Sequence, residues 1–383
     1  MKRSLLDILL CPSCARAFTE SDLVCFEESP GEVESGLLAC GCGQIFPVMA
    51  GVPIMLTGDL RGDYSGFLES HRKLIPREML SRFTEHERTP MDRKAQVKES
   101  FGYKWQLLGN YGFDGPTREF TAQWMYAGYG WGDEDTFRKE MAKKCMFLDA
   151  GCGLGREVAR FCSVNSSAPA VGIELSDCAR LAYEKVRPFP NGHIVQADLM
   201  KLPLKKGCFD FILSEGVLHH TPDTKAAFFN VCKHLAKNGE IAVYIYCIKP
   251  LMRELADIHV REETVKLTEQ ECWEYCRHLT SLGKKLQDIH QTITIDADIP
   301  ILGIEKGTYT VQGFIYRYFL KCFWNSTFSF DENNLVNFDW YHPYYAFRHT
   351  PEELKGWASI LGIQEKWFRL TESGMFFRGV KRS

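Results

Sequence analysis

The chain has 383 residues, of which 45% are hydrophobic and 25% charged, and this length allows two or three domains with a full core. Its formal net charge of -3 at pH 7 argues against a large nucleic-acid-binding surface, because such surfaces are usually basic. The apolar runs fall short of the roughly eighteen residues that a membrane-spanning helix needs, so we expect no membrane span and no membrane partner.

Fifteen cysteines are spread along the chain. Most stand singly in apolar segments, as Cys145, Cys162, Cys208 and Cys247 do, where a reduced thiol behaves as a small hydrophobic group. The apolar stretch near the N-terminus is interrupted by Asp7, so we expect no signal peptide. The cysteine usage therefore predicts a reducing, cytoplasmic location.

Residues 1–57 carry two close pairs of cysteines, Cys11 with Cys14 and Cys40 with Cys42. Four thiolates in two pairs suit a closed tetrahedral Zn²⁺ site, although the second pair is C-x-C rather than C-x-x-C. A segment this small has too little hydrophobic core to fold without a cross-link, which favours a bound metal. The sequence predicts a zinc-ribbon domain with structural Zn²⁺. The alternative is a ribbon of four reduced cysteines that has lost its metal.

Residues 61–145 are polar and aromatic without a strong hydrophobic period, and we expect a helical cap. Strands and helices then alternate regularly through residues 146–247. Nearly continuous apolar strands separated by helices predict a parallel sheet covered on both faces, which is a doubly wound α/β domain. The expected strands are Cys145–Ala150, Ala170–Leu175, His193–Ala197, Phe209–Ser214 and Glu240–Cys247, and the expected helices are Gly153–Ser163, Ser176–Val186 and Thr224–Lys237, the last ending at Asn238-Gly239.

Residues 248–349 begin with helical character and become aromatic and rich in asparagine, and we expect a helical lid over the substrate. A helix follows Thr350, with Pro351 at its first position. Ile363–Leu370 and Met375–Lys381 are then predicted to form a strand hairpin. Residues 350–383 should therefore complete the sheet of the core.

The run L-D-A-G-C-G-L-G-R joins the first strand of the core to its helix. Gly151, Gly153 and Gly155 leave no Cβ between the backbone and a ligand, so a cofactor can lie against the main chain. Glu174 ends the next strand about twenty residues later, where a carboxylate accepts hydrogen bonds from both hydroxyls of a ribose. This spacing fits NAD and S-adenosylmethionine alike, and a tight structural turn is the remaining alternative.

Asp198, after the third strand, helps to choose between NAD, S-adenosylmethionine and a structural turn. A carboxylate at that edge can accept a hydrogen bond from the exocyclic amine of adenine. The turn also has the form G-x-G-x-G rather than G-x-G-x-x-G, and S-adenosylmethionine has no pyrophosphate to accommodate. These features favour S-adenosylmethionine as the cofactor.

The segments D-A-G-C-G-L-G, I-E-L-S, Q-A-D-L-M-K-L-P and F-D-F-I-L-S-E-G-V-L-H-H resemble the successive motifs of the class I S-adenosylmethionine-dependent methyltransferases. The resemblance covers about residues 145–247 and 350–383. It implies a seven-stranded, mostly parallel sheet whose last strand inserts antiparallel. It places Asp149, Gly151 and Gly153 against the methionine part, Glu174 at the ribose, and Asp198 with Leu199 at the adenine. The expected cofactor-binding residues are Asp149, Gly151, Gly153, Gly155, Glu174, Leu175, Asp198, Leu199, Glu215, Tyr103 and Trp105.

The methyl acceptor in this fold approaches over the carboxyl ends of the fourth and fifth strands, which brings it near His219 and His220. Either histidine suits a general base, because its pKa lies near neutrality. Alternatively, the pair only shapes its loop. Tyr345 lies in the aromatic stretch Asn337–His349, which is expected to wall the acceptor pocket. His219, His220 and Tyr345 are therefore the catalytic candidates.

A second aromatic stretch, Phe101–Gln106, precedes the core. If it folds over the cofactor, Tyr103 or Trp105 would face the positive charge of the sulfonium. Ordinary core packing is the alternative for both aromatic stretches.

The segments around the paired cysteines, L-L-D-I-L-L-C-P-S-C and C-G-C-G-Q-I-F-P-V-M-A-G-V-P-I-M-L, resemble the zinc-ribbon activator subunit of several tRNA, rRNA and protein methyltransferases. Related ribbons occur ahead of bacterial small-molecule methyltransferases. Residues 248–349, which interrupt the core and are called the insertion below, are similar to the insertion of ribbon-bearing methyltransferases. Such enzymes are often found among those that tailor surface glycans and secondary metabolites.

Three functions remain in view. The first is methylation of an O, N or C atom of a small molecule or sugar derivative. The second is methylation of tRNA or rRNA, against which the near-neutral charge argues. The sequence S-E-G-V also stands where methylases of nucleic-acid and protein amide nitrogens carry N/D-P-P-Y/F. The third is a non-catalytic partner subunit, for which an intact set of glycines and acids would be unnecessary. The acceptor and the oligomeric state stay open.

Overall fold

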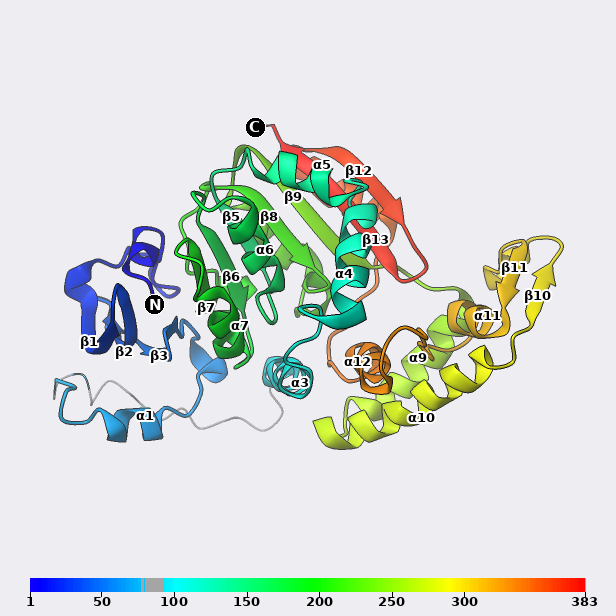
Figure 1. Cartoon of the computed structure of the whole chain (residues 1–383), viewed down its shortest axis with the longest axis horizontal. Helices are drawn as coiled ribbons and strands as arrows, with labels where there is room; N and C mark the ends of the chain where they lie inside the picture. Colours follow the sequence, from blue (N-terminus) through cyan, green and yellow to red (C-terminus); the bar gives the residue numbers. More distant parts are fainter. Residues whose placement is uncertain (77–78, 80–92, 383) are drawn as a thin grey trace.

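The computed structural model describes residues 1–76, 79 and 93–382, so residues 77–78 and 80–92 of the expected cap lie outside the described residues. Seven strands form the central sheet in the order β12-β13-β9-β8-β5-β6-β7 (Figure 1). The strands β5 to β9 run parallel, whereas β13 lies antiparallel between β9 and β12. The predicted seven-stranded sheet with an antiparallel last strand is confirmed. The strands are β5 (Phe147–Ala150), β6 (Ala170–Glu174), β7 (Gly192–Gln196), β8 (Phe209–Glu215), β9 (Leu235–Tyr246), β12 (Ile363–Leu370) and β13 (Gly374–Lys381).

Helices cover both faces of this sheet, which explains why its strands are apolar throughout. Alternate side chains of β5 point to opposite faces, since Leu148 belongs to one apolar cluster and Phe147 to the other. The first cluster includes residues of α8 (Thr224–Cys232) and α13 (Pro351–Ile360). The second includes residues of α4 (Gly115–Gly128), α5 (Glu134–Met141), α6 (Arg156–Val164) and α7 (Ala179–Val186).

The largest departure from the predicted elements is at the end of α8. We expected this helix to reach Lys237, but it ends at Cys232, and β9 begins at Leu235 instead of Glu240. Leu235 is fully buried and pairs with Phe209 of β8. Burial in the sheet therefore overrides the local helical preference. The Asn238-Gly239 pair does not stop a helix but forms part of a kink in the strand, where Asn238 has a φ of 61° and the pairing register shifts.

The N-terminal domain is an antiparallel sheet of four strands in sequence order. It lies against β7, the last strand of the central sheet (Figure 1). Ile54 pairs in parallel with Gln196 of β7, and the Met55 N–H donates to the Gln196 carbonyl. The domain thereby covers an edge whose backbone groups would otherwise be exposed. Its strands are β1 (Leu23–Ser29), β2 (Glu32–Ala39), β3 (Ile45–Met49) and β4 (Val52–Pro53).

The described part of the cap begins with α1 (Ser65–Ser70), and α3 (Arg93–Leu107) follows after the undescribed residues. Helix α3 lies at the carboxyl ends of the central strands, between the core and the insertion (Figure 1). Helix α4 packs on the sheet through Trp124, whose ring lies 4.5 Å from that of Phe376 and 4.9 Å from that of Tyr244.

The insertion forms a helical unit on the side of the core opposite the N-terminal domain (Figure 1). Helix α12 packs against α10 and α9, and α11 also contacts both of these helices. Among the described residues, no helix has the combination of length and apolar character required to cross a membrane. The elements are α9 (Leu251–Thr264), α10 (Glu269–Gln287), β10 (Thr292–Ile295), β11 (Gly307–Thr310), α11 (Val311–Tyr318) and α12 (Phe330–Tyr341).

The interior of the insertion holds polar side chains that satisfy one another. Arg253 forms a buried ion pair with Asp257, which also accepts a hydrogen bond of 2.8 Å from the Tyr341 hydroxyl. The asparagines of α12 are buried as well. Asn334 accepts from the Thr280 hydroxyl at 2.8 Å, and Asn337 donates to the same hydroxyl at 2.9 Å. The richness in asparagine therefore reflects a hydrogen-bonded core.

Replacing Asp257 with alanine should destabilise this unit, because the Arg253 guanidinium would stay buried without its counter-charge. The two side chains are only 1% and 3% exposed. We expect the free energy of unfolding, measured by urea denaturation, to fall by about 3–5 kcal/mol. Glu262→Ala on the exposed face of the same helix is the control and should cost less than about 1 kcal/mol. Equal midpoints for the two variants would contradict the expectation.

Candidate active site and metal centre

A cavity of about 430 Å³ lies at the carboxyl ends of the central strands. The loops after β5, β6, β7 and β8 form one side, and α3, α4 and the insertion form the other. This volume is within the range of small-molecule sites. The predicted site residues that line the cavity are Asp149, Gly151, Gly153, Glu174, Leu175, Asp198, Leu199, Glu215, Trp105 and His220.

The glycine turn after β5 brings bare backbone to the cavity. Gly151 (φ 98°) and Gly153 (φ 52°) both have left-handed backbones, and a Cβ on Gly151 would lie 2.4 Å from the Val217 side chain. Gly155 is outside the lining and begins α6, where a Cβ would lie 3.1 Å from the Ala182 carbonyl of α7. The first two glycines thus form a cradle, and the third allows two helices to pack closely.

Glu174 is 6% exposed and already holds the cradle in place. Its Oε2 accepts from the Gly153 N–H at 3.0 Å, and its Oε1 accepts from the Ser176 backbone N–H and hydroxyl at 2.9 and 2.7 Å. Burial raises the pKa of Glu174, whereas these hydrogen bonds lower it. Three of the roughly four acceptor positions of the carboxylate are in use, which leaves room for about one ribose hydroxyl rather than the two expected.

Asp198 stands at the opposite end of the cradle. Its Oδ1 accepts from the Met200 N–H at 2.9 Å, and its Oδ2 is paired with Lys94 of α3 at 2.9 Å. The neighbouring Leu199 is 6% exposed and offers an apolar surface. Lys94 therefore ties α3 to the end of the cavity where adenine is expected.

Two buried carboxyl groups lie beside Gly151. The Oε1 of Glu215 accepts from Arg156 at 3.1 Å, while its buried Oε2 has no hydrogen-bond partner among the described residues. Burial raises the pKa of Glu215 to about 7. Burial, with the carboxylates of Glu157 and Glu215, also raises the pKa of Asp149 well above its usual value. An orphaned carboxylate oxygen in this position suits a cationic group such as the α-ammonium of a methionine moiety.

The two adjacent histidines have different surroundings. His219 does not line the cavity, its ring is stacked on Tyr246 at 3.7 Å, and the Tyr246 N–H donates to its Nδ1 at 3.4 Å. His220 lines the cavity, and its Nδ1 lies 2.7 Å from the Tyr345 carbonyl. That carbonyl fixes the proton on Nδ1, so Nε2, which has no partner among the described residues, carries the lone pair. Burial lowers the pKa of His220 to about 4.

Two further expected residues, Tyr345 and Tyr103, do not line the cavity, and a third, Trp105, lines it next to a lysine. The carbonyl of Tyr345, not its hydroxyl, contacts His220, and the residue is not part of the lining. Tyr103 is turned onto the insertion, 6.4 Å from the ring of Trp273. Trp105 lines the cavity, but the Lys104 ammonium already lies 4.3 Å from its ring centroid.

Most of the lining residues that come from β9 and the insertion were not predicted from the sequence. Tyr246 comes from the end of β9, whereas Tyr316, Lys321 and Trp340 come from the insertion. Of these four residues, only Trp340 falls in the stretch Asn337–His349 that was expected to line the pocket. The others belong to no local motif, because their position depends on how the insertion folds back over the sheet.

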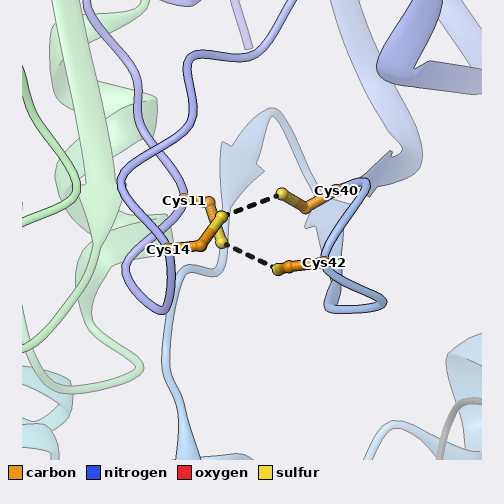
Figure 2. A group of neighbouring side chains, drawn as sticks. All are labelled: Cys11, Cys14, Cys40 and Cys42. Atoms are coloured by element: carbon orange, nitrogen blue, oxygen red, sulfur yellow. Dashed lines mark hydrogen bonds between the residues drawn. The ribbon is translucent and has the colours of Figure 1, made fainter.

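The four paired cysteines form a cluster. Their sulfur atoms lie within 4.8 Å of one another and face each other from two loops (Figure 2). The Sγ atoms of Cys11 and Cys42 are 3.7 Å apart, and those of Cys14 and Cys40 are 3.5 Å apart. In a tetrahedral site with Zn–S bonds of about 2.3 Å the sulfur atoms are about 3.8 Å apart, so the donor set fits Zn²⁺. Burial raises the pKa of Cys11 and Cys40, whereas the Gln44 N–H helps to lower the pKa of Cys42 to about 7.

Residues 148–243 match a family model described as a methyltransferase domain. No curated protein is significantly similar to the chain. Magnesium protoporphyrin IX methyltransferase from Synechocystis, with bound SAH, has 13% identity, covers 75% of this chain and 99% of its own, and has a TM-score of 0.41. 1,6-Didemethyltoxoflavin-N1-methyltransferase from Burkholderia thailandensis has 12% identity, coverages of 78% and 94%, and a TM-score of 0.39. At such low scores these likenesses assign no substrate.

The family match covers the glycine cradle, both acids at the ends of β6 and β7, and the strand that carries Glu215. The strand order and the antiparallel β13 are those expected of class I methyltransferases. The core of the chain is therefore a class I methyltransferase domain, and the protein is an S-adenosylmethionine-dependent methyltransferase.

The affinity for S-adenosylmethionine should increase as the pH rises through 7. The pKa of Glu215 is raised to about 7, so the group is largely neutral at pH 6 and largely anionic at pH 8. A cationic ligand prefers the anion, and the ionised fraction grows roughly tenfold over this range. We expect Kd, measured by calorimetry, to fall by up to about that factor.

Glu215→Gln is the control for this experiment, because glutamine keeps the shape and cannot titrate. Its Kd should stay nearly flat between pH 6 and pH 8. If the variant keeps the wild-type pH dependence, another group is responsible.

Proposed function

We propose that this methyltransferase acts on a small molecule that binds beneath the insertion, which serves as a lid. The observation that carries the proposal is that one cavity contains both the glycine cradle and the aromatic wall of the insertion. A donor and an acceptor held in one enclosed space can meet in line, and alignment supplies much of the rate enhancement of such a displacement. The enclosure also favours a small acceptor over an RNA strand.

On the donor side of the cavity, different residues would bind different parts of S-adenosylmethionine. Bound S-adenosylmethionine supplies a reactive methyl group on a sulfonium sulfur. We assign Glu174 to a ribose hydroxyl, Asp198 and Leu199 to the adenine, and Glu215 with Asp149 to the α-ammonium. The orphaned oxygen of Glu215 supports the last assignment, because a buried carboxylate gains most from a cationic partner.

His220 is the residue we assign to proton removal from the acceptor. Its pKa of about 4 keeps the ring neutral at physiological pH, and the Tyr345 carbonyl leaves the lone pair on Nε2. A base this weak takes a proton only as methyl transfer makes the acceptor atom more acidic. His219, which is stacked on Tyr246 outside the lining, is left with the positioning of the loop.

A mass-spectrometric screen for gain of one methyl group on candidate metabolites tests the proposed function directly. With an acceptor in hand, His220→Asn should lower kcat by about 10²–10⁴-fold and leave the affinity for S-adenosylmethionine unchanged. His193→Asn is a matched control. His193 is also buried with a pKa lowered to about 4, but it does not line the cavity.

Two results would contradict the proposal. A kcat for His220→Asn equal to that of His193→Asn would remove the role of a base. Methylation of bulk RNA with no transfer to any small molecule would replace the proposed acceptor class with a nucleic acid.

We also propose that the cysteine cluster holds one structural Zn²⁺. Four thiolates leave no open position for a substrate, so the metal would stabilise the N-terminal domain and take no part in methyl transfer. Metal analysis of protein purified without chelator should find about one zinc per chain. Cys40→Ser should lose the metal and make the N-terminal domain sensitive to proteolysis.

Cys25→Ser is the control for the metal centre, because Cys25 lies in the same domain, is exposed, and is not part of the cluster. It should keep full zinc content. Wild-type protein without zinc would refute the metal site.

A further inference from the structure

The lid side of the cavity contains a lysine without an anionic partner. Lys321 is only 5% exposed and lines the cavity. Its backbone N–H donates to Asp257 at 3.2 Å, but its Nζ makes no hydrogen bond or ion pair with any described residue. The nearest group to Nζ that the structure assigns is the ring of Trp340, whose centroid is 4.7 Å away. A buried ammonium without a partner is unfavourable unless a ligand completes it.

The other charged groups around Trp340 provide no counter-charge for the Lys321 ammonium. Arg253 is neutralised by Asp257, and Arg348 by Glu254. Lys249, also buried, donates only to carbonyl oxygens and to the thiol of Cys247.

The nearby Asp339 is neutralised by Lys104. Burial, and then the charge of Arg253, lower the pKa of Lys321 to about 7. None of the paired carboxylates around Trp340 is left for Lys321, so an anionic ligand would stabilise its ammonium form.

The walls around this charge are flat rings. Tyr246 and Trp340 contact each other with their planes inclined by 42° and their centroids 4.7 Å apart, and Tyr316 and Phe323 add further rings to the lining. Aromatic surfaces of this kind favour a planar ligand, whose faces and edges can pack on them. The aromatic lining and the buried lysine together indicate both the shape and the charge of the occupant.

We infer that the methyl acceptor is a planar aromatic molecule bearing a carboxylate, and that Lys321 Nζ binds this carboxylate. The inference rests on the proposed function, since it concerns the acceptor half of the same cavity. In this arrangement the ring packs against the aromatic lining, and the carboxylate lies at the lid. Lys321 is a specificity-determining residue, because a neutral analogue would leave its ammonium buried and unpaired.

Matched pairs of aromatic acids and their amides test this inference, with 4-hydroxybenzoate against 4-hydroxybenzamide and 6-hydroxy-2-naphthoate against its amide. Binding is measured by calorimetry on the full chain saturated with S-adenosylhomocysteine. We expect at least one acid to bind tenfold or more tightly than its amide. In Lys321→Met that preference should disappear, whereas Lys306→Met, at an exposed lysine of the insertion, should keep it.

Thermal unfolding distinguishes loss of binding from loss of folding. Without aromatic ligand, Lys321→Met should unfold at the same temperature as the wild type or a higher one, because it removes an unpaired buried charge. The acid should raise the unfolding temperature of the wild type but not that of Lys321→Met.

Several outcomes would overturn the inference. These are acids that bind no better than their amides, acids that do not bind at all, and an acid preference that survives in Lys321→Met. In each case, intact binding of S-adenosylhomocysteine would leave the proposed function standing. Failure of the wild type to bind S-adenosylhomocysteine would instead count against the proposed function itself.

Discussion

The turn after β5 is the constraint on which the site depends. The N–H groups of Gly151 and Cys152 both donate to the Ile173 carbonyl of β6, at 2.9 and 2.8 Å. The next residue of β6, Glu174, holds the Gly153 N–H. The left-handed glycines are thus fixed between two parallel strands, and Val217 leaves no space for a side chain at Gly151. Because the carboxyl ends of parallel strands share one edge, Glu174, Asp198 and Glu215 line the same cavity as this turn.

The insertion contains two kinds of buried charge. The pair of Arg253 and Asp257 is complete within the protein and holds α9 against α12 through the Tyr341 hydroxyl. Lys321 has no such counter-charge among the described residues and lies at the cavity. The first kind specifies how the insertion folds, and the second is available to a ligand. Both kinds of buried charge lie in one structural unit, the insertion.

Much of the core could be predicted, because its signals are local. The apolar strands, the glycine turn and the capping box of Thr350 with Glu353 each depend on residues near in sequence. The boundary between α8 and β9 was wrong for the opposite reason. Leu235 to Glu240 carry a turn signal, but pairing with β8 and full burial of Leu235 decide the conformation. Local preference is weak compared with burial of this extent.

The sequence by itself determined the class of fold, the donor cradle and the cysteine cluster, because each is encoded by residue types at fixed short spacings. Only the tertiary structure decided which histidine lines the cavity and which residues of the insertion line it. His220 owes its lone-pair geometry to the carbonyl of Tyr345, 125 residues away, and Lys104 meets Asp339 across 235 residues. Burial and charge pairing over such separations depend on the folded chain, so no local pattern could have shown them.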